Sequence, residues 1–216
     1  MNNRSKGFFL FFQMSDRGEL KVRSIDVSGI KGDVVTVHLD AVNVAQVNIF
    51  RRALLGHIET YAIEYVTFYV NSSVECDETI AFYLGQIVID NLLYQNGDGY
   101  SFMIEWQGPA TGLREITTDD IPELPFRYQT PIMKLRPGDY VRAEVVVKKG
   151  RGIDHCKWRP VAHPAIQEEE TGYRIVFKEI GMLDGPTIVE RGLAKMKEAA
   201  AQPAQNIFTR QVLWKN

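Results

Sequence analysis

Four segments of the chain alternate apolar and polar residues, which is the pattern of strands with one buried face. They lie at 34–39, 100–107, 141–147 and 173–178. Their β-branched and aromatic residues also favour strands. Turn-forming residues separate the segments, at 32–33, 96–99 and 137–139. The pattern therefore predicts a chain rich in strands that are connected by tight turns.

Residues from about 41 to 58 show helical periodicity with two apolar stripes instead of one. The first stripe contains Val42, Ala45, Ile49 and Ala53, and the second contains Val47, Phe50, Leu54 and Ile58. An ordinary surface helix presents a single apolar stripe to a single core. We therefore expect one stripe to face the chain's own core and the other to face another subunit. The pattern alone leaves open which stripe is internal.

A second helix is predicted to follow Gly185-Pro186, because proline suits a helix start and Thr187–Glu190 resembles a capping box. Its apolar side contains Ile188, Val189, Met196, Ala199 and Ala200, and Pro203 limits it. A shorter amphipathic stretch covers 77–89, with Asp77 as its cap and Ile80, Leu84 and Ile87 on one face. Strands, a long helix, further strands and a terminal helix indicate an α+β fold, not repeated βαβ units.

Composition and charge narrow the classes of function. The 216 residues are 45% apolar and carry 25 basic against 27 acidic side chains, for a net charge of −2. This balance argues against binding of nucleic acid through the chain's own field, since such domains are usually basic. The two cysteines exclude a disulfide-rich scaffold and a zinc site of four cysteines. The apolar run Phe8–Phe12 is far shorter than the roughly 20 residues that span a membrane, so we expect a soluble protein without a membrane partner.

His155, Cys156 and His163 are the first candidates for chemistry, because imidazole and thiolate bind metals and a histidine can activate a thiol. Their spacing matches no standard zinc pattern, and adjacent residues on a strand point in opposite directions. A small metal- or thiol-dependent enzyme that uses these three residues stays open as an alternative. A stand-alone protein-binding module is a third hypothesis.

Two glycine-containing loops, Lys149–Gly152 and Gly181–Gly185, are predicted to be turns. Neither matches the phosphate-binding loop of nucleotide hydrolases or the dinucleotide-binding fingerprint. Adjacent carboxylates at 77–78, 119–120 and 168–170 are not paired in a way that predicts acid and base roles. The sequence therefore predicts no catalytic residue, no metal ligand and no cofactor-binding residue.

Seven motifs in a consistent order resemble one protein family. They are Asn48–Leu55, Tyr61–Val66, Asn71–Val74, Gly108–Thr111, Pro131–Gly138, Gly150–Pro160 and Gly181–Ala200. Through them the chain is identified as a member of the family that contains the D-type subunit of archaeal RNA polymerase and the third-largest subunit of eukaryotic RNA polymerases. The N-terminal domain of the bacterial alpha subunit is a more distant member. With two cysteines, this chain departs from the many relatives that carry a cluster-binding set of cysteines in an inserted domain.

The resemblance implies a non-catalytic platform subunit. Family members pair with a smaller homologous subunit, or with themselves in bacteria, and two large catalytic subunits assemble on the pair. DNA and RNA are then contacted only through the complex, and no cofactor is implied. The protein is expected inside cells, in the cytoplasm or nucleus, or as a viral member of the family.

The resemblance also implies a division of the α+β fold. A dimerisation domain of antiparallel strands packed with two helices is expected over 6–60 and 171–216. An inserted, mainly β domain is expected over 61–170. The first and last helices form the dimer interface in the family, which implies roles for Val47, Phe50, Leu54, Ile58, Ile188, Val189 and Met196. Large-subunit contacts are implied for Arg51, Arg52, Lys149, Arg151, Lys157 and Trp158.

Overall fold

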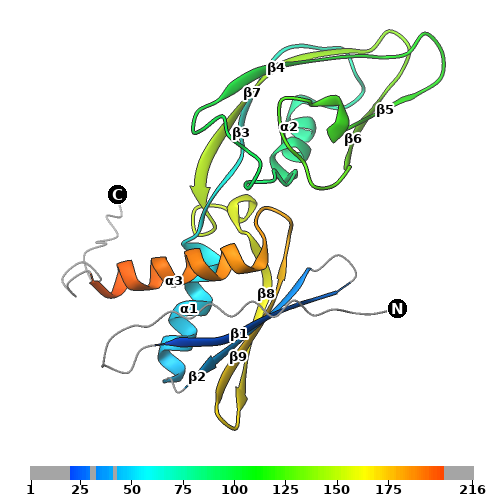
Figure 1. Ribbon diagram of the computed structural model, residues 1–216. Helices are drawn as coiled ribbons and strands as arrows, with labels where there is room; N and C mark the ends of the chain where they lie inside the picture. The colour runs from blue at the N-terminus through cyan, green and yellow to red at the C-terminus, as the bar shows by residue number, and fades with distance from the viewer. Residues whose placement is uncertain (1–19, 30–32, 41–42, 202–216) are drawn as a thin grey trace, which may run out of the picture.

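A computed structural model describes residues 20–29, 33–40 and 43–201 of the chain, without the side chains of 199–201 (Figure 1). One part is a four-stranded antiparallel sheet in the order β1-β2-β9-β8. Its strands are β1 (Lys21–Ser28), β2 (Val34–Asp40), β8 (Val161–Glu169) and β9 (Gly172–Glu179). Helix α1 (Val44–Gly56) packs against β8, and α3 (Gly185–Ala201) crosses α1.

Alternation along the strands explains the core of this part. Val35, Val37 and Leu39 of β2 are buried, and so are Ile175 and Phe177 of β9, while the residues between them are more exposed. They share one cluster with residues of the two helices, including Val47, Phe50, Leu54, Ile188 and Val189. The helices therefore cover one face of the sheet and leave the other to polar side chains.

The second part is built on a three-stranded antiparallel sheet in the order β3-β7-β4. Its strands are β3 (Glu59–Asn71), β4 (Ser101–Gln107) and β7 (Tyr140–Arg151). Helix α2 (Asp77–Gln86) and the paired strands β5 (Arg114–Thr117) and β6 (Pro131–Leu135) complete it, with short 3-10 helices at Thr118–Asp120 and Cys156–Trp158. A separate core fills this part, and among its members are Ile63, Ile80, Leu84, Trp106, Leu135 and Val145. The predicted α+β class is confirmed.

The two cores show where the chain passes from one part to the other. Strand β8 pairs with β9, and Val161 belongs to the core of the four-stranded sheet. A boundary at 170 would divide this pair, so the expected inserted segment 61–170 is corrected to end near 160. The interpretation of the two parts as a dimerisation domain and an inserted domain stays a prediction.

One buried ion cluster joins the two parts. The Arg127 guanidinium lies 3.0 Å from the Glu179 carboxylate at the end of β9 and 3.7 Å from the Asp90 carboxylate after α2. Nearby, the Asn91 backbone N–H donates to the Met182 carbonyl at 2.8 Å. These contacts hold the loop after α2 against the loop that precedes α3.

The helix caps differ from those predicted. Asp184, not Thr187, caps α3, because its Oδ1 accepts from the Thr187 backbone N–H at 3.0 Å. Asp77 is the first residue of α2 and not its cap, which is Cys76. At that position the Asp77 charge still favours the positive end of the helix dipole. Within the described ranges, no helix is both long and apolar enough to cross a membrane.

Candidate subunit interface

The second stripe of α1 faces the chain's own core. Val47, Phe50 and Leu54 have no exposed surface, and Ile58 is equally well buried. On α3, Ile188 and Val189 lie in the same cluster. Six of the seven residues assigned to a dimer interface are therefore intramolecular contacts, namely Val47, Phe50, Leu54, Ile58, Ile188 and Val189. That assignment is corrected, because the sheet and α3 already cover this side of α1.

The first stripe of α1 is the side that stays open. Ile49 is 48% exposed, and Val44, at the start of the helix, is 54% exposed. Ala45 is also exposed, whereas Ala53 is buried and Val42 lies outside the described residues. Met196, the seventh predicted interface residue, is half-buried beside the core. The apolar surface that α1 leaves open to another chain is thus centred on Ile49.

A glycine brings α3 close enough to α1 to bury the second stripe. A Cβ atom at Gly192 would lie 2.6 Å from Leu54 Cδ2 and 3.1 Å from Phe50 Cε2. Such distances are below normal van der Waals contact, so a larger residue at 192 would displace the Leu54 and Phe50 side chains or the helices that carry them. Gly192 was not identified from the sequence, where its spacing relative to the apolar positions of the helix is the only available signal.

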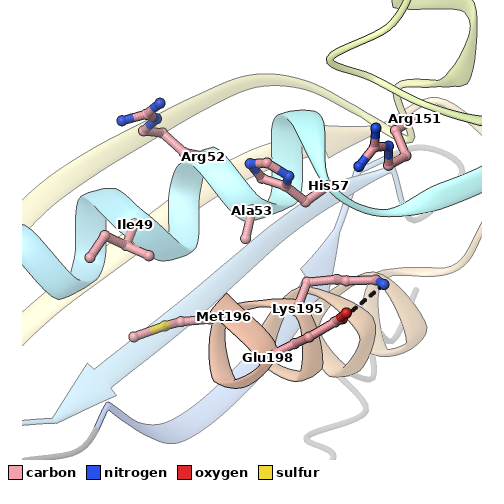
Figure 2. A pocket seen from close by; sticks show the side chains of 8 residues that line it. All are labelled: Ile49, Arg52, Ala53, His57, Arg151, Lys195, Met196 and Glu198. Carbon is pink, nitrogen blue, oxygen red and sulfur yellow. Dashed lines mark hydrogen bonds and ion pairs between the residues drawn. The ribbon is translucent and has the colours of Figure 1, made fainter. Parts of the chain in front are cut away.

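A pocket of about 360 Å³ lies between the exposed sides of the two helices (Figure 2). Its lining comes from α1, from α3, and from the end of β7, and consists of Ile49, Arg52, Ala53, His57, Arg151, Lys195, Met196 and Glu198. Figure 2 shows Ile49 and Met196 at one end and His57, Arg151 and Lys195 at the other. The pocket therefore has an apolar end and a basic end.

The basic end has a positive electrostatic potential. Burial lowers the pKa of His57 from its ordinary value of 6.5, and the nearby charges of Arg151, Arg52 and Lys195 lower it further. Lys195 pairs with Glu198 at 3.0 Å, and Arg151 pairs with Asp154 at 3.2 Å.

Two of these basic side chains remain available for binding. Within the described part of the chain, the side chains of Arg52 and His57 make no hydrogen bond or ion pair.

The Gly150–Gly152 motif explains how Arg151 reaches the pocket. A Cβ at Gly152 would overlap the Leu55 carbonyl oxygen, and a Cβ at Gly150 would overlap the Trp158 ring. The Ile153 backbone N–H donates to the Gly56 carbonyl at 3.1 Å. The two glycines thus let the end of β7 lie directly against the end of α1, which sets Arg151 beside His57.

The residues assigned to large-subunit contacts separate into two groups. Arg52 and Arg151 are exposed at the pocket, and Lys149 is exposed beside it with its amine 2.7 Å from the Glu59 carboxylate. Arg51 is partly exposed and donates two hydrogen bonds to the Asn48 side chain on the same helix. These four residues remain accessible to another chain.

Lys157 and Trp158 have structural roles instead. The Lys157 side chain is only 12% exposed, pairs with Glu64 and lies over the Trp158 ring. Trp158 is 8% exposed and donates from Nε1 to the Lys148 carbonyl at 3.1 Å. Their assignment as contacts with another subunit is corrected, because the chain itself covers them.

Comparison with known proteins gives relatives that bear polymerase subunit names. The chain is 33% identical over 137 residues to DNA-directed RNA polymerase subunit Rpo3 of Pyrococcus horikoshii, which covers 59% of this chain and 53% of the relative. For Rpo3 of Methanocaldococcus jannaschii, identity is 28% over 162 residues, covering 74% and 83% of the two chains. The chain is 28% identical over 164 residues to DNA-directed RNA polymerase II subunit rpb3 of Dictyostelium discoideum, which covers 63% of this chain and 54% of the relative.

The chain is therefore similar to the Rpo3 and Rpb3 subunits of RNA polymerases. It spans about half the length of the Pyrococcus relative. No protein-family model matches the chain. The relatives named above are archaeal and eukaryotic proteins and give no support to a viral origin.

In this relative of the Rpo3 and Rpb3 subunits, the histidine and cysteine candidates occupy a turn. His155 Nδ1 accepts from the Lys157 backbone N–H at 3.1 Å and so caps the 3-10 helix at Cys156–Trp158. The Cys156 Sγ atom lies 3.8 Å from the same nitrogen. His163 is exposed on β8, at a left-handed backbone position with φ of 52°. Among the described residues, no three or more His, Cys, Asp and Glu side chains are grouped to hold a metal ion.

Proposed function

We propose that the chain is a non-catalytic assembly subunit of a multisubunit DNA-directed RNA polymerase. In this proposal it pairs with a smaller homologous subunit, and the pair docks the two large catalytic subunits. Sequence similarity to polymerase subunits is the observation that carries the proposal. Nucleotide addition then belongs to the complex, and DNA and RNA are contacted only through it. The expected location is wherever that polymerase works, in the cytoplasm or the nucleus.

The exposed stripe of α1 supports the subunit role physically. Val44, Ala45 and Ile49 leave apolar surface in solvent beside the partly covered Met196. Burial of apolar area is favourable by about 25 cal/mol per Å². Permanent subunit interfaces bury over about 2,000 Å² and resemble a divided core. The proposed interface is centred on Ile49 and extends along both helices.

Affinity purification tests the proposal. The full chain is tagged in its native source, recovered under mild conditions and analysed by mass spectrometry. We expect two very large polypeptides and one smaller homologous subunit to be recovered with it. Recovery of the chain without any polymerase subunit would contradict the proposal.

A matched pair of variants tests the location of the interface. Ile49→Asp places a charge on the exposed stripe, so we expect loss of the smaller subunit without loss of folding, because burying an unpaired charge is costly. Leu113→Asp is the control, since Leu113 is 66% exposed and lies before β5, in the second part. Equal recovery of the smaller subunit with both variants would place the interface elsewhere.

A further inference from the structure

Basic side chains line one pocket from three elements that are distant in the sequence. Arg52 belongs to α1, His57 directly follows it, Arg151 ends β7, and Lys195 lies on α3. Burial, and then the charges of Arg151, Arg52 and Lys195, lower the pKa of His57, and Glu198 is the single acidic residue among the described residues of the lining. The pocket therefore has excess positive charge even though the whole chain has a net charge of −2.

The structure holds this charge in place. Arg151 is fixed by the close approach of Gly152 to the Leu55 carbonyl oxygen. His57 follows a helix whose inner stripe is fully buried. The backbone at these positions does not have to be ordered on binding, which lowers the cost of placing the charged side chains around an anionic group.

The apolar end limits the kind of anion that fits. Ile49 and Met196 lie beside the charged end within the same pocket, as Figure 2 shows. Ile49 also belongs to the exposed stripe, so the pocket is continuous with the surface proposed to meet another subunit. A ligand that satisfies both ends needs a negative group and an apolar group a short distance apart.

We propose that this pocket binds a glutamate or aspartate side chain of another polymerase subunit, with a neighbouring apolar side chain packed on Ile49 and Met196. This inference rests on the proposed function. An arginine fork and a lysine amine suit a carboxylate, and charge-assisted hydrogen bonds are about twice as strong as neutral ones. The contact fixes the orientation of the partner and contributes to its recognition.

A nucleic-acid backbone fits the pocket less well. Proteins that bind phosphate backbones spread basic residues along a face or a groove and usually have a high isoelectric point. Here the positive charge is concentrated in one pocket that also has an apolar end. A polypeptide segment matches both features.

Zero-length cross-linking of the native complex tests the proposal directly. A carbodiimide joins an amine to a carboxylate that already contacts it, so Lys195 is the probe. We expect a Lys195 peptide joined to an aspartate or glutamate of another subunit, in addition to the internal product with Glu198. A complex that contains the other subunits but gives only the internal product would overturn the inference and leave the proposed function intact.

Charge reversal provides a second measurement. Arg52→Glu combined with Lys195→Glu should lower recovery of the partner about tenfold or more at about 0.1 M salt. The wild type should lose partner as salt rises toward about 1 M, where the screening length falls to about 3 Å, and the double variant should depend less on salt. Lys134→Glu is the control, because Lys134 is an exposed lysine on β6.

The outcomes separate the two proposals. Thermal melting of each variant checks that it is folded before recovery is compared. Unchanged recovery with a folded double variant would overturn the pocket proposal. Loss of bound single-stranded RNA from the double variant, with protein partners unchanged, would also overturn it and assign the pocket to nucleic acid. Failure of the wild type to recover any polymerase subunit would instead contradict the proposed function.

Discussion

Trp158 is held by contacts from several directions within its own chain. Its Nε1 donates to the Lys148 carbonyl at 3.1 Å, and its carbonyl accepts from Thr60 Oγ1 at 2.8 Å. The Lys157 amine lies 4.7 Å from the ring centre. Gly150 leaves the space that the ring fills. The tryptophan thus fastens the turn after β7 to the start of β3.

Trp158→Ala should lower the free energy of unfolding by about 3–5 kcal/mol, because it leaves a cavity beside β7. Urea unfolding of the purified chain measures this change. Trp158→Phe keeps most of the packing and loses the hydrogen bond to Lys148, so its cost should be smaller. If the alanine variant is as stable as the wild type, Trp158 does not have the structural role assigned to it.

The pH dependence of stability reports on His57. Burial first, and then the charges of Arg151, Arg52 and Lys195, lower its pKa below 6.5 in the folded chain. As the pH falls through 6.5, the unfolded chain therefore takes up a proton that the folded chain resists, and the free energy of unfolding decreases. Below the pKa of His57 in the folded chain, both states carry the proton, so His57 causes no further decrease in the free energy of unfolding.

His57→Gln should flatten the dependence of stability on pH in this window, because glutamine does not titrate. Urea unfolding of both proteins across a pH series gives the two profiles. Profiles with the same slope below 6.5 would show that His57 does not have the lowered pKa. The same histidine should titrate at higher pH in the complex if a carboxylate binds beside it.

At the scale of elements, the junction of α1 with β7 requires glycine at position 152 but not at position 56. A Cβ at Gly152 would overlap the Leu55 carbonyl oxygen, whereas a Cβ at Gly56 would lie 3.6 Å from Ile153 Cβ, an ordinary contact. The first clash involves backbone, which a side-chain rotation cannot relieve. The two glycines therefore provide a matched test of the junction.

Gly152→Ala should destabilise the chain by about 1–3 kcal/mol through forced backbone movement. Gly56→Ala should be neutral or stabilising by up to about 1 kcal/mol, because alanine is the better helix former. Thermal unfolding of both variants distinguishes them. Equal effects of the two substitutions would show that the close approach at Gly152 is not a structural constraint.

The elements that the sequence predicted are those whose pattern is local. Alternation identified β2, β4, β7 and β9, and helical periodicity identified α1 and α3. Strand β8 was missed because Pro164 and the left-handed His163 interrupt its alternation and shift its register. The two stripes of α1 were visible in the sequence, but the side that α3 covers depends on Gly192, far along the chain.

The candidate site was only partly accessible to sequence reasoning for the same reason. Arg52 and Arg151 were identified, but their meeting with His57 and Lys195 results from tertiary packing. The family resemblance implied a large-subunit contact for Lys157, but its burial depends on Glu64 of β3. No local pattern encodes that pairing.

At the scale of the whole molecule, Arg127 joins the two cores. Glu179 is 6% exposed, and burial raises its pKa above the ordinary 4.5 in spite of the nearby Arg127. Without the guanidinium, the carboxylate would be buried near Asp90 with no compensating charge. The relative position of the two parts therefore depends on this ion cluster.

Arg127→Met should cost about 3–5 kcal/mol at neutral pH, because it removes one partner of a buried ion pair. The loss should shrink as the pH falls toward 4.5, since protonation of Glu179 removes the uncompensated charge. The matched control is Arg142→Met, which breaks the exposed pair with Glu105 and should cost about 1 kcal/mol or less. Urea unfolding at two pH values measures both, and equal costs would contradict the structural role of Arg127.

The subunit role is tested most directly by the composition of the native assembly that contains the full chain. Native mass spectrometry of the affinity-purified material gives the stoichiometry without depending on any variant. The account predicts one copy of the chain in fixed ratio with one smaller homologous subunit and two large catalytic polypeptides. A chain recovered alone, or in a closed assembly made only of its own copies, would contradict it.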